Sequence, residues 1–166
     1  MNQSRFNKWI IASHRFARIE PFLAPVLQGL GRLDCQLIAQ DAEFLAKTNE
    51  ERASILTSMQ LNDRVTQSYL WVLGGYEFIR TVNQRLRGLA LEQETAAVKN
   101  QFNRLRVPLA KLEAARRSPN DSPIAFPALN ESLGIAWQIG PQDFITRREL
   151  SDSLLELANH FETSTG

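Results

Sequence analysis

The stretch SYLWVLGGYEFIRTVNQRLR, residues 68–87, decides the fold of this chain of 166 residues. On a helix of 3.6 residues per turn, its apolar positions fill one continuous arc about 160° wide. The arc consists of Trp71, Val72, Gly75, Tyr76, Phe78, Ile79, Val82 and Leu86. This pattern predicts a central helix with a wide buried face. Because glycine is costly inside a helix, we expect neighbouring helices to approach closely at Gly74 and Gly75.

A second side of the same helix carries charge. Glu77 and Arg80 are three residues apart, so they can form an ion pair. Tyr69, Leu73 and Tyr76 lie beside them, so we expect this side to be covered as well. Three interpretations stay open. The pair is a partly buried contact that orients neighbouring elements, a ligand-binding or catalytic site made of Tyr69, Tyr76, Glu77 and Arg80, or part of a homodimer interface.

The segments before residue 68 also have helical periodicity. One helix is expected over about residues 4–19, and apolar residues at steps of three and four predict another over residues 22–45. Gly29 and Gly31 either weaken this second helix from within or mark a break in it. A helix through Ile55, Leu56 and Met59 is then expected before the central one, which spans roughly residues 62–89.

A further helix is expected after the central one, and another at the end of the chain. The first of these two has a short heptad pattern, formed by Val98, Phe102, Leu105, Leu109 and Leu112. Pro108 removes a backbone donor from it, which predicts a kink or a restart of the helix there. In TRRE, Thr146 and Glu149 have the spacing of a capping box, which predicts the start of the last helix.

Residues 118–141 differ from the rest, because they are rich in proline. GIAWQI, residues 134–139, alternates apolar and other residues and predicts a short strand. Its expected partner is PIAF, residues 123–126, at a sheet edge because Pro127 lacks a backbone donor. The fold predicted is mainly α: a single-domain helical bundle, residues 1–166, of five to seven helices with a short β-hairpin-like insertion near residues 118–141.

Composition excludes several classes of protein. No apolar run approaches the roughly 18 residues of a membrane span, so we expect a cytoplasmic protein with no membrane partner. Cys35 is the only cysteine, which excludes an intrachain disulfide. The histidines, His14 and His160, lie at opposite ends of the chain and lack metal-ligand spacing. No glycine-rich phosphate loop and no known catalytic motif is present, so no cofactor is expected.

Positive charge gathers in one part of the chain. Residues 80–117 contain nine lysines and arginines against three glutamates. Arginine suits the recognition of phosphate and carboxylate groups. The candidate nucleic-acid-binding residues are Arg85, Arg87, Arg104, Arg106, Arg116 and Arg117. The alternative interpretation is a solvated helix surface.

An all-helical chain with an arginine-rich helix resembles the HEPN class of helical domains, many of which cleave or bind RNA. Their usual signature is an arginine followed four to six positions later by a histidine. No arginine stands at that spacing before His14 or His160. The resemblance is therefore to an architecture, and it implies RNA binding or cleavage as an alternative function.

The absence of a catalytic motif and the two-sided central helix favour a non-catalytic interaction or regulatory module that self-associates as a homo-oligomer. One alternative is a nucleic-acid-binding protein or HEPN-like ribonuclease that uses the arginine-rich segment. The other is a small-molecule enzyme or ligand-binding protein with its site at Glu77 and Arg80.

Overall fold

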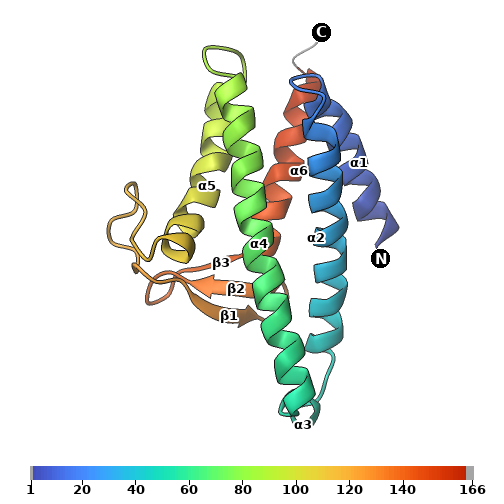
Figure 1. The fold of residues 1–166 in the computed structure, drawn as a ribbon, viewed down its shortest axis with the longest axis vertical. Helices are drawn as coiled ribbons and strands as arrows, with labels where there is room; N and C mark the ends of the chain where they lie inside the picture. Colours follow the sequence, from blue (N-terminus) through green and yellow to red (C-terminus); the bar gives the residue numbers. More distant parts are fainter. Residues whose placement is uncertain (1, 164–166) are drawn as a thin grey trace.

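The computed structural model describes residues 2–163, which form six helices and one three-stranded sheet (Figure 1). The helices are α1 (Gln3–Ala17), α2 (Leu23–Leu45), α3 (Asn49–Arg52), α4 (Ile55–Arg85), α5 (Glu92–Ala110) and α6 (Arg147–Thr163). The strands are β1 (Phe126–Asn130), β2 (Gly134–Gln138) and β3 (Phe144–Thr146). A mainly helical fold with a small β insertion is therefore confirmed.

Helix α4 lies at the centre of the core. The apolar arc expected on it is buried, except that Tyr76 is half-buried. A Cβ atom placed on Gly74 would lie 3.2 Å from Leu30 of α2, and one on Gly75 would lie 2.5 Å from Phe102 of α5. Gly74 thus allows close packing of α2 on α4, and Gly75 allows close packing of α5. The close approach expected at the two glycines is confirmed.

The structure settles two helix boundaries. The helix expected through Ile55, Leu56 and Met59 is the first part of α4, because neither glycine nor proline interrupts the chain between it and residue 68. Helix α2 continues through Gly29 and Gly31, so of the two alternatives the interior position is confirmed and the break is wrong. A Cβ atom on Gly31 would lie 2.4 Å from Cγ of Trp9. Gly31 therefore allows α1 to pack closely against α2, and it does not end the helix.

Pro108 lies in the last turn of α5, and the helix ends two residues later at Ala110. The restart expected at Pro108 is therefore wrong. The heptad pattern also extends too far, because Leu112 lies beyond the helix end, with a φ angle of 56° and 65% of its surface exposed.

The three strands form an antiparallel sheet in the order β1-β2-β3. The strand expected at residues 134–139 is confirmed as β2, which lies in the middle of the sheet and contacts α2, α4 and α6. Its edge partner β1 begins at Phe126 and contains Pro127, so it lies later than expected but at an edge as predicted. Strand β3 was not predicted, because Phe144, Ile145 and Thr146 resemble the start of the last helix.

The lower parts of α2 and α4 extend past the sheet and the other helices, and α3 connects them at the tip (Figure 1). We call this projecting part, residues 43–60, the hairpin tip. None of the helices within residues 2–163 is long and apolar enough to span a membrane.

Candidate functional site

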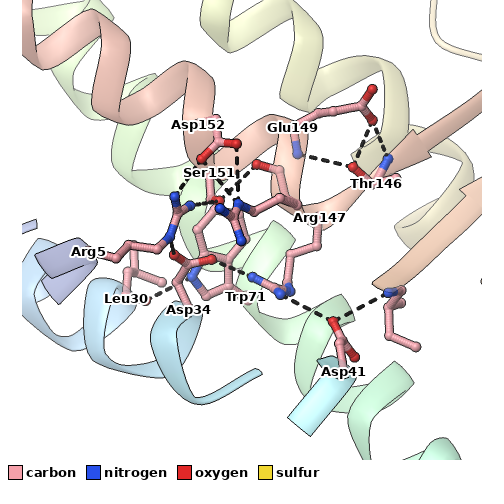
Figure 2. A network of polar contacts seen from close by, with 12 residues as sticks. Arg5, Leu30, Asp34, Asp41, Trp71, Thr146, Arg147, Glu149, Ser151 and Asp152 are labelled. Atoms are coloured by element: carbon pink, nitrogen blue, oxygen red, sulfur yellow. Dashed lines mark hydrogen bonds and ion pairs between the residues drawn. The ribbon is translucent and has the colours of Figure 1, made fainter. Parts of the chain in front are cut away.

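A network of arginines and aspartates, most of them buried, joins α1, α2, α4 and α6 in the interior of the protein (Figure 2). Charged side chains are seldom buried unless they are paired, so their number here marks this region as the candidate functional site. The members of the network are Arg5, Asp34, Asp41, Arg64, Arg147 and Asp152.

Asp34 of α2 lies at the centre of the network and is fully buried. Its Oδ2 atom accepts hydrogen bonds from Nε of Arg5 at 2.6 Å and from the indole N–H of Trp9 at 2.9 Å. Its Oδ1 atom accepts a hydrogen bond from Arg147. Asp34 thus binds two residues of α1 and the first residue of α6.

Arg147 is also fully buried, and local structure at the start of α6 fixes its position. The hydroxyl of Thr146 accepts from the backbone N–H of Glu149 at 3.0 Å, and the Glu149 carboxylate accepts from the backbone N–H of Thr146 at 2.8 Å. The predicted capping box is therefore confirmed. The guanidinium of Arg147 lies 5.9 Å from the ring centre of Trp71 and bridges Asp34 and Asp41 (Figure 2).

Asp41 is the least tightly held member of the network. Its Oδ2 atom lies 3.4 Å both from Arg147 and from the backbone N–H of Ile135, and its Oδ1 atom lies 3.6 Å from Nη1 of Arg64. A Cβ atom on Gly134 would lie 2.1 Å from the Asp41 carboxylate. Strand β2 can therefore lie this close to Asp41 only because residue 134 is glycine. Burial raises the pKa of Asp41 above its ordinary value, because it outweighs the long contacts with Arg147, Ile135 and Arg64.

At its other end the network reaches the surface between α1 and α6. Arg5 donates from Nη1 to Asp152 and from Nη2 to Ser151, both at 2.6 Å. Asp152 also contacts Arg148 at 3.2 Å, and Arg5, Arg148 and Asp152 line a cavity of about 440 Å³. The pKa of Arg5 is raised, since Asp34 and Asp152 outweigh the opposite effect of burial.

The network as a whole is suited to holding helices together. Removing one partner of a buried ion pair leaves an uncompensated charge, which costs about 3–5 kcal/mol. Within residues 2–163 there is no group of three or more histidine, cysteine, aspartate or glutamate side chains that could hold a metal ion. Burial raises the pKa of Cys35, and the adjacent Asp34 raises it further, so this thiol is a weak nucleophile at neutral pH.

The residues expected to form a ligand site on α4 lie away from this network. Arg80 and Glu77 form the expected ion pair at 2.7 Å, and their side chains are 41% and 52% exposed. Tyr69 and Tyr76 are half-buried against the core, and the guanidinium of Arg106 lies 5.0 Å from the ring centre of Tyr76. A role for these four α4 residues in binding stays a prediction.

The candidate nucleic-acid-binding arginines are spread along α5 and its flanks. Arg85 pairs with Glu20 at 3.3 Å, and Arg104 pairs with Asp121 at 2.7 Å and Asp143 at 2.9 Å. The exposed arginines fall into two groups, Arg85 and Arg87 before α5 and Arg116 and Arg117 after it. The helix between them is about 28 Å long, at 1.5 Å per residue. Nucleic-acid binding by these arginines also stays a prediction.

The buried network was not predicted from the sequence, although one signal for it is present. Leu27, Asp34 and Asp41 are each seven residues apart, so the two aspartates lie on the same side of α2 as a core leucine. An aspartate on the apolar side of a helix indicates a buried partner. The partner itself, Arg147, is more than a hundred residues away in the sequence, and only the fold identifies it.

Comparison of the chain with protein-family models, with curated proteins and with solved structures finds no significant match.

Proposed function

We propose that this protein is a non-catalytic helical interaction module that self-associates through the hairpin tip. The observation that carries the proposal is a patch of three apolar side chains at the start of α4. Ile55, Leu56 and Met59 are exposed over 82%, 67% and 62% of their surface. Residues three and four apart on a helix are neighbours, so the three side chains are contiguous. Exposed apolar patches of a few hundred Å² are typical of interaction sites.

The surroundings of this patch suit a second copy of the same chain. Within the hairpin tip, Lys47 and Arg52 carry positive charge, and Glu43, Glu50 and Glu51 carry negative charge. In a two-fold symmetric dimer the same surface meets itself, so a surface of one sign would repel its copy, whereas this one carries both signs and can pair with itself. A polar rim around an apolar centre is also the usual composition of an interface.

The test replaces two of the three exposed apolar side chains of this patch with glutamate. In the double variant Leu56→Glu, Met59→Glu, we expect a monomer at concentrations at which the unmodified protein associates, as measured by sedimentation velocity. The fold should be retained, because both side chains point into solvent and acidic residues are favourable near a helix N-terminus.

Leu89→Glu is the matched control. Leu89 is 61% exposed and follows the opposite end of α4, so this variant should associate like the unmodified protein. The proposal is wrong if the unmodified protein stays monomeric up to millimolar concentration. It is also wrong if Leu89→Glu disrupts association as strongly as the double variant.

A further inference from the structure

Helices α2 and α4 contact each other closely near Leu30 and enclose a cavity nearer the hairpin tip. In the close contact, the indole N–H of Trp71 donates to the backbone carbonyl of Leu30 at 2.9 Å. Towards the hairpin tip, long polar side chains separate the two helices and leave a cavity of about 260 Å³. The cavity is lined by Gln40, Glu43, Phe44, Lys47, Gln60, Asp63, Arg64 and Gln67.

Three polar atoms in the wall of this cavity are buried and lack a hydrogen-bond partner within the described residues: Nη2 of Arg64, Oε1 of Gln40 and Oε1 of Gln67. Buried polar atoms in native proteins are nearly always paired, so three unpaired ones around one cavity require an explanation. Arg64 is only 5% exposed. Of the three unpaired atoms, Nη2 of Arg64 is the strongest sign of a missing ligand, since a buried charged donor requires an acceptor.

The guanidinium of Arg64 is held in a fixed orientation. Its Nη1 atom donates to the backbone carbonyl of Gln40 at 2.8 Å, and its Cζ atom lies 4.4 Å from the ring centre of Phe44. The unpaired Nη2 group is therefore held in one place. A charged N–H donor in a fixed position suits one oxygen of a carboxylate.

The other two unpaired atoms, Oε1 of Gln40 and Oε1 of Gln67, require a hydrogen-bond donor. The two glutamine Oε1 atoms are acceptors, and an ammonium group can donate to both. The charged side chains of the lining, Glu43, Asp63, Lys47 and Arg64, sum to zero, so the cavity favours a ligand without net charge. Its volume is below the usual range for drug-sized ligands, which restricts the ligand to a small molecule.

We propose that the cavity between α2 and α4 binds a small zwitterion that carries both a carboxylate and an ammonium group, the chemistry of a free amino acid. The carboxylate accepts from Nη2 of Arg64, and the ammonium group donates to Gln40 and Gln67. Lys47 follows α2 and reaches across to α4, where Nζ donates to Thr57 at 3.3 Å and Gln60 at 3.5 Å. These two long hydrogen bonds are the contacts that break when the ligand enters.

The test is a titration of the full chain with each of the common free amino acids, followed by thermal unfolding and by calorimetry. At least one amino acid should raise the unfolding temperature and bind saturably. Its N-acetyl derivative lacks the ammonium group and its methyl ester lacks the carboxylate, so each should bind at least about tenfold more weakly, the effect of losing one charge-assisted contact.

Two variants locate the binding. Gln67→Leu removes one acceptor at little structural cost and should weaken binding about tenfold, while Gln101→Leu, at an exposed position of α5, should leave binding unchanged. Unfolding of each variant without ligand shows that the fold is intact. The proposal is wrong if no free amino acid binds, if both capped derivatives bind as tightly as the parent amino acid, or if a correctly folded Gln67→Leu variant binds normally.

Discussion

Gly29 and Gly31 stand two residues apart in α2, but their surroundings differ. Gly29 has no atom within 4 Å of the place where a Cβ would lie, whereas at Gly31 that place is 2.4 Å from Cγ and 2.5 Å from Cβ of Trp9. Trp9 is fully buried and its indole N–H donates to Asp34, so it cannot move aside. The same residue type is therefore dispensable at one position and required at the other.

This difference predicts opposite signs for two equal substitutions. Gly29→Ala should raise the free energy of unfolding by about 0.5–1 kcal/mol, because alanine loses less backbone entropy in a helix than glycine does. Gly31→Ala gains the same propensity but forces the new methyl group into Trp9, so it should lower the free energy of unfolding by about 1–3 kcal/mol. Urea denaturation measures both. Equal stabilisation by the two variants would contradict the close contact of α1 with α2.

Among the elements, α3 and α6 begin with the same device but use it differently. Thr48 and Glu51 form a capping box at α3, and Thr146 and Glu149 form one at α6. None of the residues of α3 is buried, whereas Thr146 is buried and precedes the fully buried Arg147. The cap of α6 therefore positions a residue of the core network.

The comparison of these two caps gives a second prediction. Thr146→Ala should lower the free energy of unfolding by about 1–2 kcal/mol, because it removes the cap and loosens Arg147. Thr48→Ala should lower it by less than about 0.5 kcal/mol, because α3 is short and exposed. Thermal and urea unfolding of both variants test this. A loss of similar size in the two variants would show that the α6 cap acts only locally.

Local patterns predicted most elements correctly, whereas the role of Gly31 and the buried network depend on distant residues. The arc on α4, the strand β2 and the cap at Thr146 depend on neighbouring residues, so the sequence is sufficient for them. The sequence left two alternatives for Gly31, because Trp9, which requires a glycine there, belongs to another helix. The pairing of Asp34 with Arg147 was missed for the same cause.

On the scale of the whole molecule, the buried network connects the two ends of the chain. Arg5, in the first turn of α1, contacts Asp152 of α6, which is 147 residues later in the sequence. Asp34 and Arg147 connect these helices to α2. Because each charge needs its partners, helices packed in another arrangement would leave buried charges unpaired. We infer that the network selects this arrangement of helices, at some cost in stability.

Asp41 makes this cost depend on pH. Its pKa in the folded protein is raised above the ordinary 3.8, since burial outweighs the contacts with Arg147, Ile135 and Arg64. Between 3.8 and the higher folded value, the folded chain binds more protons than the unfolded chain, so the contribution of Asp41 to the free energy of unfolding falls as pH rises. The contribution is fully present below the unfolded pKa and is lost once pH exceeds the folded pKa.

The variant Asp41→Asn lacks this titration and isolates it from that of other groups. Glu51, for example, has a pKa lowered mainly by its hydrogen bond from the backbone of Thr48, so its effect has the opposite sign, but it is the same in both proteins. With urea unfolding measured from pH 4 upward, the unmodified protein should lose stability relative to Asp41→Asn until the folded pKa is passed, and the difference should then be constant. A difference independent of pH would contradict the raised pKa. A difference that grows in favour of the unmodified protein as pH rises would mean that Arg64 and Arg147 hold the carboxylate more strongly than burial opposes it.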